Sequence, residues 1–209
     1  MPTLWAAALF STPPPTITRR SKGFTEAFRH EYFAGDAEKL LSNSADHLPR
    51  STILNRNAAA IADLLQVHVG MAGSPVLKVL YPSVSDTVAN CAAFMRPATT
   101  EFTPGYGYLL SIDFTTLATA RAFYDNLHMH HGPHLGAHLT LAFNYNDCVL
   151  GKEWEEFKYQ VEYGLRTQRR EQVRIAVGLE EVGELVPVFE EALKFAVEAL
   201  KEGETYSRL

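Results

Sequence analysis

The sequence lacks several features that would assign it quickly to a class of protein. It has only two cysteines, Cys91 and Cys148, which lie far apart and in no Cys-x-x-Cys spacing. That arrangement argues against a disulfide framework or a cysteine-based zinc site and suits a reducing compartment. The chain also has no basic block, and its net charge is -5, so a nucleic-acid partner is not expected.

Long apolar runs and familiar catalytic motifs are missing as well. No stretch approaches the roughly 20 apolar residues that a transmembrane helix needs. The apolar run at residues 4–10 has no preceding positive region, so it does not look like a signal peptide. We therefore expect a cytoplasmic protein without a membrane partner. Internal repeats, a Walker A motif, GxGxxG after a strand, HExxH and GxSxG are absent.

The composition that remains is that of an ordinary globular protein. Hydrophobic residues make up 46% of the chain and charged residues 21%, which is enough apolar material for a sizeable core. Three consecutive prolines, Pro13 to Pro15, stop regular structure near the start. We predict an extended N-terminal arm over residues 1–20 and a single α+β domain over residues 21–209.

Periodicity predicts helices and strands in irregular alternation. The first helix, residues 24–41, carries an aromatic stripe that we interpret as core: Phe24, Phe28, Tyr32 and Phe33. Ser51 is the expected N-cap of a second helix at 52–67, and Thr115 or Thr116 is the expected cap of a helix that ends at Leu127. The other predicted elements are strands at 76–81, 106–114, 139–143 and 173–177, helices at 116–127, 152–163 and 182–200, and a long irregular connection at 82–106. Together they predict a two-layer sandwich, with a mainly antiparallel sheet of about four strands and helices on one face.

Arg174 is the unusual residue of the last predicted strand, a permanent cation between Val173 and Ile175. A cation in a half-buried strand is costly unless an anion or a well-placed acceptor meets it. Its partner would be a glutamate or a carbonyl of the protein itself, or else the carboxylate of a bound ligand. The strand alone favours the internal partner.

Five histidines gather in a short glycine-rich segment: His128, His130, His131, His134 and His138. Some of them are spaced i, i+4, as metal ligands on a helix would be. Gly132, Pro133 and Gly136 rule out a regular helix here, and no nearby carboxylate or thiol completes a tetrahedral set. We predict no metal site, and we interpret the segment as a surface loop or as part of a small-molecule pocket.

Two tyrosines and an aspartate belong to the strand predicted at 106–114. Tyr106 and Tyr108 share one strand face, and Tyr108 is expected to be a core or interface aromatic with its hydroxyl satisfied. Asp113 has the opposite parity and is expected to be a structural hydrogen-bond acceptor.

Five segments, in the same order along the chain, resemble motifs of one enzyme family. They are Asn55 to Ala58, Gly105 to Phe114, Ala122 to Leu127, Gly132 to Gly136 and Arg174 to Glu180. The last resembles the R-[IL]-S-V-G-[IL]-E signature of the cysteine/methionine-metabolism enzymes that use pyridoxal phosphate, the cystathionine γ-synthase-like group. Gly132 to Gly136 resembles the G-P-S-L-G turn of fungal members. The resemblance covers most of the chain, from residue 24 to residue 200.

The resemblance implies an α+β small domain without the cofactor-binding part. Members of the family are about twice this length, and their first two thirds hold pyridoxal phosphate through a lysine in an S-x-T-K motif. Lys22, Lys39 and Lys78 lie in no such context. The chain therefore resembles the C-terminal small domain standing alone, and no cofactor is predicted.

Carried over residue by residue, the resemblance places Arg174 where the family holds the substrate α-carboxylate. His134 stands at the position of the turn serine, near cofactor and substrate, and Ala176 replaces the serine of the last motif. These differences imply a domain that kept its fold and lost its ancestral site.

We accordingly expect a cofactor-independent enzyme acting on a small molecule, an intramolecular cyclase of the Diels–Alder type in secondary metabolism. The predicted catalytic residues are Arg174, His134 and His138, and the predicted substrate-binding residues are Tyr106, Tyr108, Phe143 and His131. The alternative is a non-catalytic partner that docks on a cystathionine γ-synthase-like enzyme. A homo-oligomer is compatible with either role.

Overall fold

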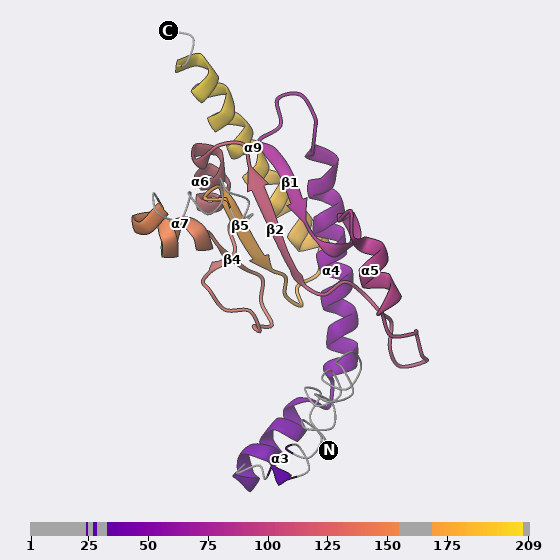
Figure 1. Cartoon of the computed structure of the whole chain (residues 1–209). Helices are drawn as coiled ribbons and strands as arrows, with labels where there is room; N and C mark the ends of the chain where they lie inside the picture. The colour runs from indigo at the N-terminus through magenta and orange to yellow at the C-terminus, as the bar shows by residue number, and fades with distance from the viewer. Residues whose placement is uncertain (1–23, 25–26, 29–32, 155–168, 207–209) are drawn as a thin grey trace. The chain divides into compact units, whose positions relative to one another are not determined.

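The computed structural model describes residues 24, 27–28, 33–154 and 169–206 (Figure 1). Contacts along the chain divide it into two units, residues 1–45 and residues 46–209. The predicted arm at residues 1–20 and most of the helix predicted at 152–163 lie outside the described residues. The domain boundary predicted at residue 21 therefore stays a prediction.

The first unit contains helix α3, Ala34–Asn43, none of whose residues is buried. The aromatic stripe predicted to be core is wrong at its three described positions. Phe24, Phe28 and Phe33 are 71%, 53% and 73% exposed. Periodicity shows which side of a helix is apolar, but burial also requires a surface that packs against that side.

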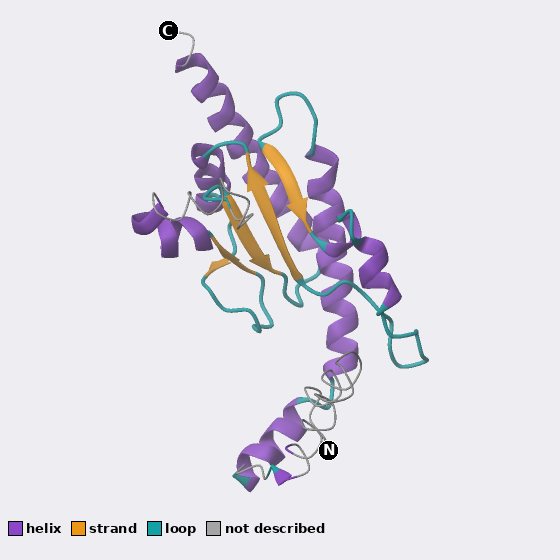
Figure 2. Ribbon diagram, in the orientation of Figure 1, coloured by secondary structure: helices purple, strands orange, loops and turns teal. Residues whose placement is uncertain are grey.

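The second unit is built on a five-stranded sheet in the order β1-β2-β5-β4-β3 (Figure 2). The strands are β1 Val76–Leu80, β2 Leu109–Phe114, β3 His130–His131, β4 Leu141–Phe143 and β5 Gln172–Ala176. All neighbours pair antiparallel except β3 and β4, which are parallel. The α+β class and the mainly antiparallel sheet are confirmed. The additional strand is a two-residue piece of the histidine segment, too short to show a period.

Three long helices pack on one face of this sheet: α4 His47–His68, α6 Leu117–Asp125 and α9 Val182–Tyr206 (Figure 1). Aromatic rings join the layers, because the Phe123 ring lies 4.9 Å from that of Phe114 on β2 and 6.2 Å from that of Phe189 on α9. All three side chains are fully buried. Such ring pairs add to the apolar burial that holds helices and sheet together.

Strand β5 shows the alternation predicted for it. Val173, Ile175 and Val177 are completely buried in the core, while Arg174 points to the opposite face and is half-buried. β5 lies between β2 and β4 at the centre of the sheet. The central strand therefore presents one cation on the face away from the core.

Two helix starts were predicted from cap residues, with different outcomes. Thr116, one of the two predicted caps, begins α6 through a reciprocal capping box with Thr119. The Ser51 cap is wrong, because α4 begins at His47, after Asp46. Pro49 lies in the first turn of α4, where its missing N–H costs no helical hydrogen bond.

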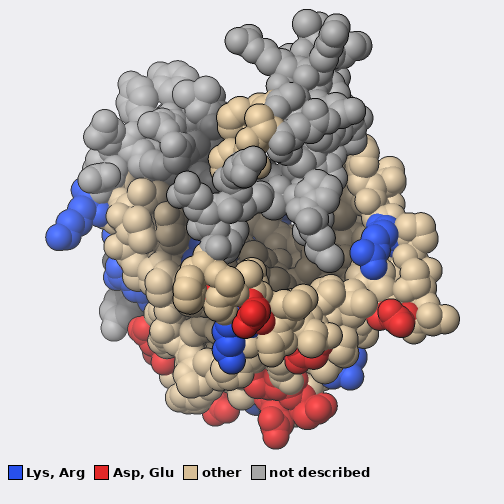
Figure 3. Space-filling model, turned by 90° about the horizontal axis from the view of Figure 1, so that it is seen from below, with Lys and Arg blue, Asp and Glu red and all other residues tan. Residues whose placement is uncertain are grey.

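The connections hold short helices that the sequence did not resolve. They are η1 Pro82–Val84, α5 Val88–Ala93, α7 Tyr145–Leu150 and η2 Gly151–Glu153. Within the described ranges, no helix combines the length and the apolar character needed to cross a bilayer. On the face seen in Figure 3, acidic side chains gather along the lower edge and basic ones lie scattered.

Asp147 of α7 forms ion pairs with Arg121 of α6 and with Arg170, just before β5. Its carboxylate accepts hydrogen bonds from Arg121 of α6 at 2.9 Å and from Arg170 at 2.6 Å. Burial alone would raise the pKa of Asp147, but the hydrogen bonds and charges of the two arginines outweigh it, so its pKa is lowered. Because the pKa of Asp147 is lower in the folded protein than in the unfolded chain, its carboxylate stabilises the fold at pH values above the unfolded-state pKa. This contribution is lost as the pH falls through the folded-state pKa.

We predict that Asp147→Asn lowers the free energy of unfolding at pH 7 by about 1–2 kcal/mol, because two charge-assisted hydrogen bonds are lost. The difference from the parent should shrink as the pH falls through the lowered pKa of Asp147, because the parent carboxylate then becomes protonated. Urea unfolding at pH 7 and at a series of acidic pH values measures this. Asp125→Asn, at an exposed position of α6, is the control. A loss that stays the same over the whole acidic series would contradict the assignment.

Candidate functional site

The loop at residues 132–139, between β3 and β4, is bonded to β5 and to the segments just before β2 and just after β5. The Tyr108 hydroxyl donates to the Leu135 carbonyl at 2.6 Å, and Arg174 Nη2 donates to the Pro133 carbonyl at 3.1 Å. The Leu179 amide donates to the His138 carbonyl at 2.9 Å. These bonds bring the histidine segment to the ends of β2 and β5. We call residues 132–139 the site loop.

Arg174 lies on the sheet face opposite the helices. Its neighbours across the strands are Ser111 on β2 and Phe143 on β4. The guanidinium carbon is 5.9 Å from the centre of the Phe143 ring and 5.1 Å from that of Tyr145. These cation–π contacts orient the guanidinium without neutralising its charge.

Arg174 has a carbonyl partner, which is one of the internal partners that the sequence allowed. In the part of the chain that the structure describes, no carboxylate forms an ion pair with it, whereas Asp or Glu meets Arg50, Arg121, Arg169 and Arg170. A guanidinium carries five N–H donors in a planar fork. The arrangement can therefore receive a carboxylate beside the Pro133 contact.

A hollow of about 190 Å³ lies at the other end of the site loop, lined by Arg50, Leu54, Tyr108, Gly136, Ala137, His138 and Leu179. Arg50 comes from the first turn of α4 and forms an exposed ion pair with Asp46 at 2.9 Å. The hollow thus places a second cation, Arg50, and the His138 imidazole beside the site loop.

The predicted site residues divide into two groups. Arg174, His134, His138, Tyr108 and Phe143 lie on the site loop or contact it or Arg174. His134 Nδ1 accepts the Gly136 amide at 3.0 Å, which is a bond within the loop itself.

Tyr106 and His131 make other contacts. The Tyr106 ring meets that of Tyr81 edge-on at 6.2 Å. The His131 ring stacks on Tyr124 at 4.2 Å, and its Nε2 is 3.2 Å from the Leu127 carbonyl. Because β2 begins at Leu109, neither Tyr106 nor Tyr108 is in the strand, so the shared strand face predicted for them is wrong.

The prediction for Asp113 is confirmed, because it accepts a hydrogen bond from Gln172 Nε2 at 2.9 Å. The Tyr108 hydroxyl is satisfied as predicted, but its ring is only half-buried and does not belong to the core. Burial raises the pKa of Asp113, although the Gln172 bond and the charges of Arg169 and Lys78 act against it. Asp113 therefore serves the packing of β2 on β5.

A polar network that the sequence analysis did not predict fixes the start of β4 against the end of β5. The Glu180 carboxylate accepts the Thr140 amide at 2.6 Å and the Thr140 hydroxyl at 2.8 Å. The same hydroxyl accepts the Gly178 amide at 2.9 Å. Asn57 of α4, completely buried, donates to the Gly178 carbonyl at 3.0 Å and to the Glu180 carbonyl at 2.7 Å. We call these four residues the Glu180 network.

The Glu180 network closes the site loop at its C-terminal end, because Thr140 directly follows residue 139. Asn57 and Glu180 both lie in segments that resemble the family motifs, which was the available signal for this network. Their positions along the chain do not show that the two residues are close in space. A buried polar network is stabilising only when every member is paired, as these hydrogen bonds achieve.

We predict that Gly178→Ala lowers the free energy of unfolding by about 3 kcal/mol. A Cβ at this position would collide with the Glu180 carboxylate and with the main chain at Leu139 and Thr140. Gly183→Ala is the matched control: nothing lies near its Cβ position, and alanine favours the helix. Thermal and urea unfolding of both variants measure the difference, and equal stabilities would show that Gly178 is not confined.

The described residues provide few ways to hold a metal or cofactor. No group of three or more His, Cys, Asp or Glu side chains in the described ranges could hold a metal ion. The hollow and the contacts of Arg174 include cations, phenols and imidazoles, but no lysine. The site therefore fits an anion and offers no amine to attach an aldehyde cofactor.

Comparison with known proteins finds fungal relatives over most of the chain. Cystathionine gamma-synthase of Neurospora crassa is 37% identical over 168 residues, which are 80% of this chain and 24% of the relative. Cystathionine gamma-synthase-like enzyme iboG1 of Amanita muscaria is 34% identical over an alignment of 189 residues, and the match covers 84% of this chain and 30% of the relative. The chain thus spans less than a third of the length of these curated relatives.

A solved structure shares the fold. Cystathionine gamma synthase from Xanthomonas oryzae pv. oryzae, in complex with cystathionine, matches with a TM-score of 0.62 at 20% identity. The match covers 89% of this chain and 44% of that one. No family-level sequence profile matches the chain.

Proposed function

This chain is homologous to a C-terminal-type domain of the fungal cystathionine gamma-synthase-like proteins, and we propose that it works as a carboxylate-binding small domain. The observation that carries the proposal is Arg174, a half-buried cation at the centre of the sheet that has a carbonyl partner and an aromatic platform. The ligand is a small amino acid whose α-carboxylate meets the free part of the guanidinium fork.

The surroundings of Arg174 support this role physically. The bond to the Pro133 carbonyl and the rings of Phe143 and Tyr145 hold the guanidinium, so less side-chain freedom is lost when an anion binds. The site loop is closed by the Glu180 network and so keeps the Pro133 carbonyl in place. A preorganised donor binds an anion more tightly than a mobile one.

Pyridoxal phosphate would supply the reactive aldehyde in a complete enzyme of this family. The described site residues fit a substrate carboxylate but not the attachment of that cofactor, so no chemical step is derived through it. We propose that this chain contributes substrate binding and that a cofactor-binding domain of a cystathionine gamma-synthase-like partner contributes the chemistry.

We predict that L-cystathionine, the molecule bound in the related solved structure, binds the purified chain and that Arg174→Met weakens this binding about 10- to 100-fold. The loss follows from removing charge-assisted hydrogen bonds to the carboxylate. Isothermal titration calorimetry measures the affinity. Arg174→Lys should recover only part of it, because an ammonium lacks the planar fork.

Arg96→Met is the matched control for that titration. Arg96 lies over the Phe102 ring in the connection before β2, so its replacement removes an arginine away from the site loop. Equal affinities of the parent and Arg174→Met for L-cystathionine would contradict the proposal. So would equal losses in the Arg174 and Arg96 variants.

A second prediction concerns the cofactor. Pyridoxal phosphate mixed with the purified chain should leave no Schiff-base absorbance band after dialysis, because the described site offers no lysine. The spectrum of a known pyridoxal phosphate enzyme treated in parallel is the control. A band that survives dialysis and disappears on borohydride reduction would place the attachment within this chain and contradict the division of roles.

The intramolecular cyclase is the second candidate. In its favour, Arg174, His134 and His138 gather potential hydrogen-bond donors at one loop, where they would stabilise a polarised carbonyl. A cyclase must also enclose its substrate, and the hollow beside His138 measures about 190 Å³, below the roughly 300 Å³ usual for ligand pockets. Turnover of a linear polyene by the purified chain, lost in His134→Ala, would favour the cyclase over the carboxylate-binding domain.

A further inference from the structure

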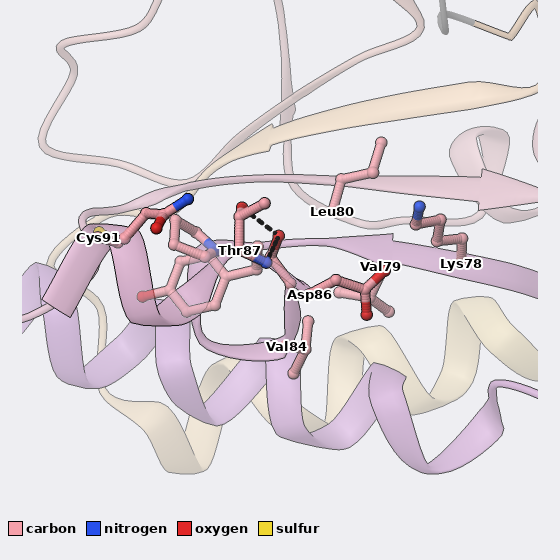
Figure 4. Close-up of a pocket in the computed structure, with 11 residues that line it drawn as sticks. Lys78, Val79, Leu80, Val84, Asp86, Thr87 and Cys91 are labelled. Atoms are coloured by element: carbon pink, nitrogen blue, oxygen red, sulfur yellow. Dashed lines mark hydrogen bonds between the residues drawn. The ribbon is translucent and has the colours of Figure 1, made fainter.

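A second and larger hollow, of about 630 Å³, lies beside strand β1 (Figure 4). One side of it is lined by every residue from Lys78 to Pro82, and the other side by residues of the η1–α5 segment between Val84 and Cys91. It shares no lining residue with the hollow beside His138, so it is a separate site. We call it the β1 hollow.

The β1 hollow lies at the open edge of the sheet rather than over one of its faces. Successive residues of a strand point to opposite faces. Figure 4 accordingly shows Lys78 on the other side of the β1 ribbon from Val84 and Asp86. The side chain of Val79 is not accessible, because this residue is only 3% exposed. A hollow that touches Lys78, Val79 and Leu80 in turn must therefore meet their main chain, at the edge that β2 does not cover.

The main chain of β1 has hydrogen-bonding groups to offer along this edge. β1 is the outermost strand and pairs with β2 alone. Within the described ranges, no main-chain hydrogen bond from another segment reaches residues 78–80. The N–H and C=O groups of an edge strand that point away from its neighbour can pair with a further strand. The edge of β1 is thus able to receive an added segment.

The far wall determines what kind of strand fits. η1 and α5 stand across the hollow from β1. The turn between them is held by local bonds, since the hydroxyls of Ser85 and Thr87 are 2.9 Å apart and the Thr87 amide donates to Ser85 Oγ at 3.2 Å. A strand added to a sheet lies about 4.8 Å from its neighbour. With this wall on its other side, the hollow fits a single extended segment better than the edge of a second sheet.

Lys78 adds a charge preference to this edge. It is the middle residue of β1, and it is exposed on the sheet face away from the core. No ion pair among the described residues includes it, and Asp113, its neighbour across the strands, accepts a hydrogen bond from Gln172. A second copy that paired antiparallel through β1 would bring the two Lys78 side chains together, and like charges at neighbouring positions are destabilising. An acidic residue opposite Lys78 is favourable.

We propose that the β1 hollow binds an extended segment of another protein, which adds to β1 as a sixth strand of the sheet. The strand is antiparallel to β1, because antiparallel pairs are slightly more stable. It carries an acidic residue opposite Lys78 and, two positions earlier, an apolar residue opposite Leu80, which is 37% exposed on the same face. Main-chain bonds to residues 78–80 provide the pairing, and these two side chains set the register. This interaction goes beyond the carboxylate site at Arg174 and does not depend on it.

The test is an NMR titration of the full chain, labelled with nitrogen-15, with the peptide acetyl-Thr-Val-Thr-Glu-Thr-amide. Its valine is placed opposite Leu80 and its glutamate opposite Lys78. We expect shifts in the amide signals of residues 78–80, and binding about 2- to 5-fold tighter than that of the same peptide with lysine in place of glutamate. Lys78→Glu should reverse this preference, whereas Lys194→Glu, at an exposed position of α9, should preserve it.

N-methylated peptides distinguish strand addition from binding through side chains alone. Alternate N–H groups of an extended segment face the same neighbouring strand. Methylation of the valine nitrogen or of the central threonine nitrogen, each in a separate peptide, should therefore abolish the shifts in one case and preserve most of the binding in the other. Equal binding of both methylated peptides and the parent peptide would overturn the proposal. So would a titration in which no signal of residues 78–80 moves.

A filling variant and the oligomeric state complete the test. Asn90→Trp adds bulk at an exposed lining residue, and it should abolish the peptide shifts while the melting temperature stays within a few degrees of the parent. Arg174→Met should leave the shifts unchanged, so failure here and failure of the carboxylate site can be told apart. Sedimentation should show no dimer formed through β1. A dimer that Asn90→Trp converts to a monomer would place a second copy at this edge and overturn the proposal.

Discussion

The arrangement of the second unit depends on one polar constraint, the pairing of Glu180 with Thr140. Two oxygens of a single carboxylate hold the amide and the hydroxyl at the start of β4, and Asn57 of α4 holds the turn that carries Glu180. Helix, sheet and site loop therefore meet at one point. Gly178 has no room for a side chain there, because the main chain at Leu139 and Thr140 already fills that space.

That constraint gives Arg174 its chemical character. An arginine on a sheet face normally gains a carboxylate partner or extends into water. Here the loop closed by the Glu180 network offers the Pro133 carbonyl, and β4 and α7 offer two aromatic rings. These groups orient the guanidinium and leave its positive charge available, which is the condition for receiving an anion from outside the protein.

The sequence predicted most of the second unit because its signals were local. The alternation of Val173, Ile175 and Val177 and the capping residue Thr116 depend only on near neighbours, and both appear in the structure as expected. The aromatic stripe of the first unit failed because burial depends on a second surface. The Ser51 cap prediction was wrong because several polar residues precede α4 and could each cap it. Pro49 is compatible with the first helical turn, so the helix begins earlier, at His47.

Periodicity and ordered motifs along the chain were enough to predict the fold class, the last strand with its single cation, and the resemblance to the cystathionine γ-synthase-like group. The central place of that strand in the sheet came from the structure. So did the finding that Tyr108 and His138 lie by the site loop while Tyr106 and His131 contact other residues. The structure alone joined Asn57 to Glu180, which are 123 positions apart. Loop geometry and long-range hydrogen bonds are set by packing, and residue spacing carries no information about them.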